Sequence, residues 1–228
     1  PAYTHLEGIG RNLHEMAREA GVQLEFKGVQ MDLETEDSLE SLKSLGKAAA
    51  ESGEALAVNF SFHLHHMADE SVSTSNPRDR LLRAVRAMGP RVVTLVEHEA
   101  NTNTSPFYPR FVEAVSYFGA VFESLEGCHG RSGRAGAGAE AVRRGLARDI
   151  VNIISCEGGE RWERYEVFRK WKSRMAMAGF EPVCLRRDGR IVEGVLGTSW
   201  GKYTVREDSG ALFLDWRDRA LVAASAWK

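Results

Sequence analysis

The chain has 228 residues, of which 43% are hydrophobic and 27% are charged, and this favours a single α/β domain with one continuous core over a disordered chain. Its formal net charge of −2 at pH 7 excludes a protein that binds nucleic acid through its overall charge, because phosphate binding requires clustered lysine and arginine in excess. The most apolar stretches, such as residues 92–96, are far too short to cross a bilayer, so we expect no membrane-spanning segment.

The first half of the chain alternates helical and strand-like patterns. The helical patterns place apolar residues three and four positions apart, whereas the strand-like ones are short apolar or alternating runs. Asn76 and Pro77 are typical of a helix N-cap and of a first helical turn. In chain order we expect a helix over 6–20, a strand over 22–26, a helix over 39–51, a strand over 55–62, a helix over 77–88 and a strand over 91–96. Strands that alternate with helices predict a mainly parallel sheet.

The second half begins with helical patterns and ends with short strands. Beyond Gly179, turn residues separate the apolar runs, which favours antiparallel pairing. Helices are expected over 109–125, 147–154 and 162–178, and strands over 181–185, 203–206, 212–216 and 220–227. The glycine-rich stretch 127–145 has few large apolar residues and is expected to form a flexible surface loop. The predicted fold class is α/β: a Rossmann-like, methyltransferase-type, mainly parallel sheet that antiparallel C-terminal strands close.

Five motifs follow one another along nearly the whole chain. They are A-L-A-V-N-F-S-F-H-L-H-H-M-A-D-E-S at 55–71 with N-P-R-D at 76–79, V-E-H-E-A-N-T-N at 96–103, F-Y-P-R-F-V-E-A at 107–114, the block 148–180 that begins R-D-I-V-N, and S-A-W at 225–227. In this order they resemble the second leucine-rich region, the V-E-x-E-x-N-x-N run, the PFYRE region, the arginine–glutamate block and the SAW motif of the plant GRAS domain. The chain therefore resembles the C-terminal portion of a GRAS (SCARECROW-like) domain.

The resemblance implies a single partial GRAS domain over 1–228. The leucine-rich II region and core strands would occupy 1–105, the PFYRE region 106–180 and the SAW region 181–228. The family's V-H-I-I-D strand, which is central in its sheet, is absent before Pro1. We therefore expect the sheet formed by these residues to be incomplete.

The resemblance also implies a nuclear transcriptional regulator that acts through protein–protein interaction. Its expected partners are other GRAS proteins, in homo- or heterodimers, and DNA-binding transcription factors. Catalysis is not expected. Two alternatives stay open: direct sequence-specific DNA binding through a local basic groove, and a methyltransferase-like domain that binds a small ligand.

A cofactor site for S-adenosylmethionine would need a glycine-rich turn after the first strand and an acidic residue after the second. Gly8 and Gly10 lie within a helical pattern that no strand precedes, so we predict no cofactor and no catalytic residue. Glu97 and Glu99 follow an apolar strand, where paired carboxylates could serve as acid and base. Because no nucleophile accompanies them, we expect them to accept hydrogen bonds from neighbouring loops.

Three histidines, His63, His65 and His66, have the composition of a metal cluster, because imidazole is a common ligand. On a strand, however, His66 would point away from the other two. The cysteines, Cys128 among them, are odd in number and widely spaced, so they form no C-x-x-C metal pair and no disulfide framework. We therefore predict no metal site, and expect histidines at a strand end that form hydrogen bonds with the following loop.

Basic and aromatic residues are interleaved over 161–174, on a helix in this prediction. The simplest interpretation is an aromatic stripe of Trp162, Tyr165 and Phe168 that faces the core, with salt bridges on the outer face. The basic residues are the candidates for DNA contact under the alternative function. They are Arg161, Arg164, Lys170, Lys172 and Arg174.

Residues 200–227 are rich in aromatic side chains, which are favoured both in cores and at interfaces. We expect Trp216 and Trp227 in the core. Trp200, Lys202 and Tyr203 flank a glycine and are the predicted protein-interface residues.

Overall fold

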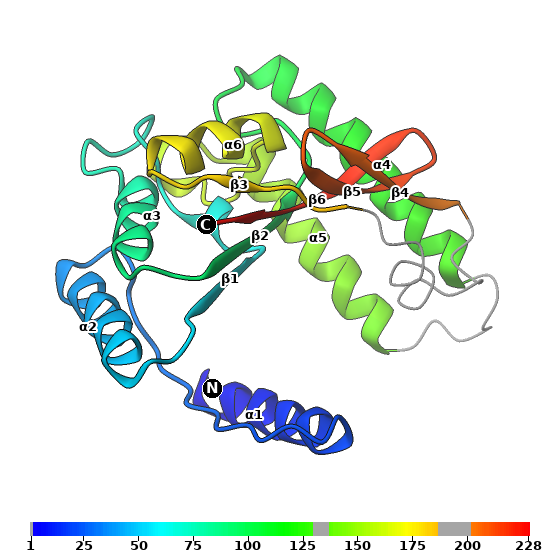
Figure 1. The fold of residues 1–228 in the computed structure, drawn as a ribbon. Helices are drawn as coiled ribbons and strands as arrows, with labels where there is room; N and C mark the ends of the chain where they lie inside the picture. Colours follow the sequence, from blue (N-terminus) through cyan, green and yellow to red (C-terminus); the bar gives the residue numbers. More distant parts are fainter. Residues whose placement is uncertain (1, 130–136, 187–201) are drawn as a thin grey trace.

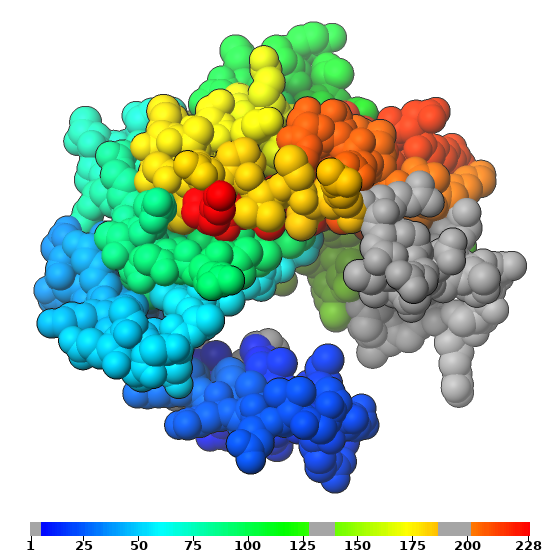
Figure 2. All heavy atoms as spheres, in the orientation of Figure 1, coloured from blue at the N-terminus to red at the C-terminus, as the bar shows by residue number. Residues whose placement is uncertain are grey.

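The structure is a computed structural model that describes residues 2–129, 137–186 and 202–228. Its main body is a sheet with helices packed around it, and helix α1 (Ala2–Glu19) lies apart from this body (Figure 1). Figure 2 shows α1 and the segment after it as a separate lobe. Within this lobe the ring of Phe26 approaches Gly10 so closely that a side chain there would collide with it.

The parallel part of the sheet is a crossover from β1 (Ala57–Ser61) through α3 (Pro77–Ala87) to β2 (Val92–His98), with Phe60 opposite Leu95. Asn76 caps α3, as its sequence predicts, because its side chain accepts a hydrogen bond from the N–H of Asp79. Helix α2 (Glu36–Ser52) packs beside α3.

The C-terminal part of the sheet is antiparallel. It consists of β3 (Pro182–Val183), β4 (Tyr203–Asp208), β5 (Ala211–Trp216) and β6 (Arg219–Trp227). Strand β6 lies between β2 and β5 and runs antiparallel to both, and β3 pairs with its end. The SAW motif is therefore part of a central strand, in which Ser225 lies opposite Leu95 and Trp227 opposite Val93.

The predicted mainly parallel sheet is wrong for the described residues. Only β1 and β2 pair in parallel there, and the fold is mixed α/β with a mainly antiparallel sheet in the order β1-β2-β6-β5-β4. Two-residue turns join β4 to β5 and β5 to β6, and such short turns connect only antiparallel strands. The strand expected over 22–26 does not form, and this segment runs beside α1, where no strand offers a hydrogen-bonding edge.

Three helices differ in extent from their predictions. Helices α4 (Phe107–His129) and α5 (Ala137–Ser155) extend from both sides into the stretch expected to be a loop, and residues 130–136 lie outside the described part. Helix α6 (Phe168–Met177) begins six residues later than expected from position 162. Residues 162–167 form neither helix nor strand, because other segments bind their backbone. Two 3-10 turns, η1 (Leu64–His66) and η2 (Gly158–Glu160), complete the described elements.

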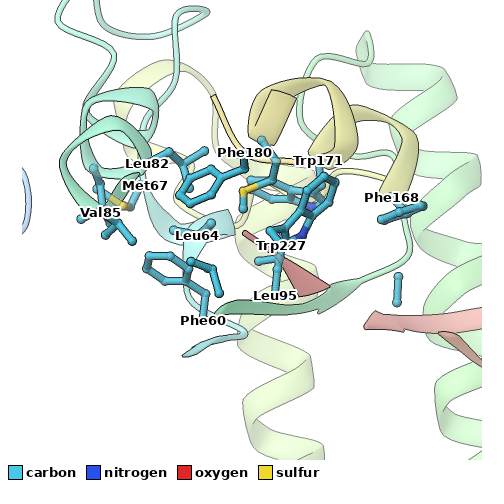
Figure 3. Close-up of a cluster of buried hydrophobic side chains, with 14 of the residues drawn as sticks. Phe60, Leu64, Met67, Leu82, Val85, Leu95, Phe168, Trp171, Phe180 and Trp227 are labelled. Carbon is cyan, nitrogen blue, oxygen red and sulfur yellow. The ribbon is translucent and has the colours of Figure 1, made fainter. Parts of the chain in front are cut away.

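Two clusters of buried side chains hold the body together. The larger one joins β1, β2, α3 and α6, and in Figure 3 Trp171 and Trp227 lie at its centre. The smaller one joins α4 and α5 to the end of the sheet and includes Tyr117 and Trp216. Both Trp216 and Trp227 are buried, which confirms their predicted place in the core.

The described sheet has two open edges, where β1 pairs with β2 alone and β4 pairs with β5 alone. A search of the described residues finds no helix that is both long enough and apolar enough to cross a membrane.

Candidate functional site: the polar centre beyond β1 and β2

Polar side chains gather where β1 and β2 end, the edge at which open α/β sheets bind ligands. Glu97, near the end of β2, is buried, and its Oε1 accepts hydrogen bonds from the N–H groups of His63 at 3.2 Å and Leu64 at 2.9 Å. Its Oε2 lies 2.5 Å from Nδ1 of His65. One carboxylate thus shapes the turn after β1 and orients the imidazole within it.

Both carboxylates were predicted to accept hydrogen bonds from neighbouring loops; this is confirmed for Glu97, whereas the donor to Glu99 belongs to a helix. Glu97 does so at η1, and Oε2 of Glu99 accepts a hydrogen bond at 2.7 Å from the N–H of Phe168, the first residue of α6. A carboxylate at this position satisfies an N–H that has no partner within the helix and is stabilised by the helix dipole.

A second carboxylate, Glu163, faces the histidines from segment 161–167, which forms neither helix nor strand. Its Oε2 lies 3.4 Å from Nε2 of His65, and its Oε1 lies 3.3 Å from Nδ1 of His66. Oδ1 of Asn152 fixes its backbone by accepting hydrogen bonds at 2.9 Å from the N–H groups of Trp162 and Glu163. The N–H of Arg164 donates to the carbonyl of His65 at 3.0 Å, so the segment and η1 are joined directly.

The charges in this centre are strongly coupled. Burial alone would lower the pKa of His65, but the carboxylates of Glu163 and Glu97 outweigh it and raise that pKa to about 9. Burial would likewise raise the pKa of Glu163, yet His65 and His66 hold it at about 2. The centre therefore attracts positive charge.

His98 lies between His65 and strand β6, at the side of the polar centre that faces the C-terminal strands. Burial lowers its pKa to about 3, so it is neutral. Its ring stacks on that of Tyr165 at a centroid distance of 4.3 Å. The hydroxyl of Tyr117 donates to the carbonyl of Leu221 at 3.0 Å and therefore accepts the proton on Nδ1 of His98, 2.8 Å away.

A separate network of buried ion pairs lies beside this centre. Arg174 donates to Glu166 through Nε at 2.6 Å and to Asp69 through Nη2 at 2.9 Å, and Arg78 donates to Glu166 at 3.1 Å. The side-chain amide of Asn103 donates to both carboxylates. This network joins the loop before α3, the loop after β2 and helix α6.

The predicted DNA-contact residues divide into two groups. Arg161, Arg164 and Arg174 are buried, and Arg161 donates from Nη1 to the carbonyls of Thr102 at 2.7 Å and Asn103 at 2.8 Å. Arg164 donates to the carbonyl of Gly158 at 2.7 Å.

The two lysines of the set are nearer the surface. Nζ of Lys170 donates to side chains of the loop after β2, and Nζ of Lys172 donates to the carbonyl of Ser209 at 3.3 Å. The structure thus does not gather the five residues on one surface.

The predicted aromatic stripe is only partly buried, and the described interface residues lie at or near the surface. Tyr165 and Phe168 are buried, but Trp162 is 57% exposed, because residues 162–167 do not form the expected helix. Of the interface residues, Trp200 lies outside the described part of the chain and Lys202 is exposed. Tyr203 is half-buried, with its ring edge-on to Trp216 at 4.8 Å.

Helix α4 carries an exposed apolar face that was not predicted from the sequence. Between positions 106 and 119 the exposed residues carry no charge, and five of them are large and apolar or aromatic. These five residues, called the α4 face below, are Phe107, Tyr108, Phe111, Val112 and Val115. These residues recur at positions i, i+1, i+4, i+5 and i+8, which predicts one apolar face on the expected helix. The same pattern is typical of a helix that faces the core, so it does not show that the face is exposed.

Comparisons with known proteins agree with this structure. The sequence pattern of the GRAS domain family matches residues 2–228. The chain is 47% identical over 221 residues to Scarecrow-like transcription factor PAT1 of Arabidopsis thaliana. This alignment covers 96% of this chain and 43% of that protein. It is 46% identical over 223 residues to chitin-inducible gibberellin-responsive protein 2 of Oryza sativa subsp. japonica. This alignment covers 97% of this chain and 39% of that protein.

More distant matches include a solved structure. The DELLA protein DWARF8 of Zea mays is 33% identical over 235 residues, covering 98% of this chain and 37% of that protein. The crystal structure of SCL7 from Oryza sativa aligns with a TM-score of 0.82 at 30% identity, covering all of this chain and 61% of that one. The chain thus spans less than half the length of the three curated relatives. These matches show that the chain belongs to the GRAS domain family.

Proposed function

We propose that this chain is part of a nuclear transcriptional regulator of plants that acts by binding other proteins, and that the α4 face is one of its binding surfaces. Its partners in this proposal are other GRAS proteins and DNA-binding transcription factors. The α4 face carries the argument for a protein surface. Large apolar side chains cluster there without charge, and such exposed patches are typical of sites that another protein covers.

The polar centre supports a role without catalysis. Its carboxylates and imidazoles are bound to the backbone and to one another, so they join segments that are distant in sequence. The side chains of His65, Glu97 and Tyr165 fill the space beyond the strand ends, where a methyltransferase-like domain would hold its ligand.

Direct DNA binding has less support. Three of the five candidate arginines and lysines are buried, and the pocket of about 400 Å³ beside α6 combines Arg169 and Lys170 with Glu70 and Glu166. Mixed charges of this kind do not supply the basic surface that phosphate contacts require. Lys202 and Tyr203 remain predicted interface residues in a second surface.

The test is a transcriptional reporter in plant protoplasts that express the full chain beside a second GRAS-domain protein. The proposal predicts that reporter output depends on both proteins and that the double variant Phe111→Ser, Val112→Ser reduces it to the level of the second protein alone. The matched control is Val142→Ser, Met177→Ser, which removes two exposed apolar side chains elsewhere. Equal output from the α4 variant and the control would contradict the role of the α4 face.

A further inference from the structure

Three metal-binding side chains converge in the polar centre. His65, His66 and Glu163 each offer one ligand atom, and these atoms all lie within 4.8 Å of one another. We propose that these three residues bind a divalent metal ion of the Zn²⁺ type, and that Glu97 positions His65 for this role. The inference is independent of the protein partners proposed above.

The distances between the ligand atoms suit a metal better than hydrogen bonds. Each imidazole lies beside a different oxygen of Glu163: Nε2 of His65 is 3.4 Å from Oε2, and Nδ1 of His66 is 3.3 Å from Oε1, so an ion between them would meet both oxygens of the carboxylate. Bonds of about 2.0–2.1 Å around a tetrahedral Zn²⁺ place neighbouring ligand atoms about 3.3–3.5 Å apart. A hydrogen bond between the same atoms would bring them to about 2.9 Å.

An unsatisfied oxygen points into the site. The Glu163 side chain is only 4% exposed, and its Oε2 has no hydrogen-bond partner among the described residues, although it faces Nε2 of His65. A buried carboxylate oxygen without a partner is costly, and few native structures contain one without a reason. A cation between Glu163 and the two imidazoles would satisfy it.

The far side of His65 is already arranged as in metal sites. Oε2 of Glu97 accepts from Nδ1 at 2.5 Å, so Nε2 is the ring nitrogen that faces Glu163 and would bind an ion after losing its proton. A carboxylate behind a ligating histidine fixes its tautomer and raises its basicity, and this is the common second shell of protein metal sites. Glu97 is itself held by two backbone N–H groups, so the imidazole has little freedom.

The charge balance also favours a divalent ion. Glu97 and Glu163 are both buried carboxylates that flank the two imidazoles. A divalent ion bound there by uncharged imidazoles would balance the two carboxylates, so the group would carry no net charge. A buried group that is neutral overall avoids the penalty of an unpaired buried charge.

The ligand set and its exposure define the class of ion. Two imidazole nitrogens and one carboxylate oxygen suit Zn²⁺ and related transition metals rather than Ca²⁺ or Mg²⁺. His66 is 45% exposed, so an ion can enter from solvent and keep water as a fourth ligand. Bound there, it would join η1 to segment 161–167, which the backbone hydrogen bond from Arg164 to His65 already holds together.

The sequence predicted no metal site, because the three histidines at 63–66 were expected to lie on a strand. Strand β1 ends at Ser61, and the 3-10 turn η1 brings His65 and His66 toward the same carboxylate. Their rings lie with centroids 4.0 Å apart. Glu163 is almost a hundred positions away in the sequence, so no local residue spacing indicates that it lies beside the histidines.

The experiment measures Zn²⁺ binding to the full chain by isothermal titration calorimetry and the thermal midpoint with and without Zn²⁺. The test variants are His66→Ala and Glu163→Gln, and the matched control is His63→Ala, an exposed histidine outside the site. The proposal predicts one ion per chain, affinity reduced at least about 10-fold in both test variants and unchanged in the control. It also predicts that Zn²⁺ raises the midpoint of the wild type and of His63→Ala, but not that of His66→Ala.

Two results would overturn the site. One is an absence of saturable Zn²⁺ binding by the wild type, and the other is binding that His66→Ala leaves unchanged. If Glu163→Gln fails to fold, Co²⁺ is used instead of Zn²⁺, with the wild type and His66→Ala. The visible spectrum of bound Co²⁺ reports its coordination geometry. A spectrum of four-coordinate Co²⁺ that His66→Ala abolishes supports the site, and a spectrum of six-coordinate Co²⁺ that persists in this variant contradicts it.

Discussion

The indole Nε1 of Trp227 donates a hydrogen bond to Oγ of Ser225, 3.0 Å away, inside the core of the protein. The SAW motif therefore has a structural meaning. Its serine satisfies the one polar atom of the tryptophan side chain, and both residues belong to a strand that joins the parallel pair to the antiparallel strands.

The first prediction concerns this pair. Trp227→Ala should lower the free energy of unfolding by about 3–5 kcal/mol, because it removes a large buried side chain. Ser225→Ala should cost about 1–3 kcal/mol by leaving the indole N–H without a partner. Urea denaturation measures both. Trp162→Ala, at an exposed tryptophan, is the control and should change stability by no more than about 0.5 kcal/mol.

The second prediction concerns two glycines in helices. A methyl group at Gly46 would lie 2.6 Å from Cβ of Met88, where α2 packs on α3, whereas one at Gly119 in α4 would meet nothing within 4 Å. Gly46→Ala should therefore destabilise the protein by about 1–3 kcal/mol. Gly119→Ala should stabilise it by about 0.5–1 kcal/mol through helix propensity. Thermal midpoints that shift in the same direction for both variants would contradict this packing.

The third prediction concerns the buried ion pairs. Arg174→Met removes the cation that contacts Asp69 and Glu166 and should cost about 3–5 kcal/mol, because it leaves buried carboxylates without their partner. Arg83→Ala breaks a pair with Asp79 at a largely exposed arginine and should cost less than about 1 kcal/mol. Chemical denaturation of both variants, with slopes equal to that of the wild type, measures the difference. Equal costs would show that Arg174 has no special role.

The fourth prediction is a pH dependence. Burial raises the pKa of Glu99 to about 7, from 4.5 in the unfolded chain. Between these pH values the folded state binds more protons than the unfolded state, so the free energy of unfolding falls as pH rises through this window.

The variant Glu99→Gln tests that dependence, since its amide oxygen can still accept from the N–H of Phe168. It should be more stable than the wild type at pH 8 by about 1–3 kcal/mol, and less dependent on pH between 5 and 7. The exposed Glu126→Gln is the control. A free energy of unfolding that falls less from pH 5 to pH 7 in Glu99→Gln than in the wild type would agree with this sign; an unchanged slope in Glu99→Gln would refute it.

The sequence was most informative where structure depends on local patterns. Helices α2 and α3 and the antiparallel C-terminal strands were predicted, because Asn76, Pro77 and the turn residues act on their immediate neighbours. It failed at segment 161–167, whose apolar spacing resembles a helix. Asn152 and the loop after β2 bind its backbone instead, and these partners are remote in sequence.

The polar centre was predictable only in part. The role of Glu97 and Glu99 followed from their position after an apolar strand, but Glu163 and the buried arginines did not. Arg161, Arg164 and Arg174 look like surface residues in the sequence, because the carbonyls and carboxylates that satisfy them lie on other elements. Likewise, a helix periodicity alone does not tell whether an apolar face is covered, as the α4 face shows.

The most direct test of the proposed function is the dissociation constant between this chain and a second GRAS-domain protein, measured by calorimetry for the wild type and for Phe111→Ser, Val112→Ser. The account predicts that the double variant keeps its thermal midpoint but binds at least about 10-fold more weakly, because two central apolar contacts are lost. The control Val142→Ser, Met177→Ser should bind like the wild type. A double variant that binds as tightly as the wild type would contradict the assignment of the α4 face as a protein-binding surface.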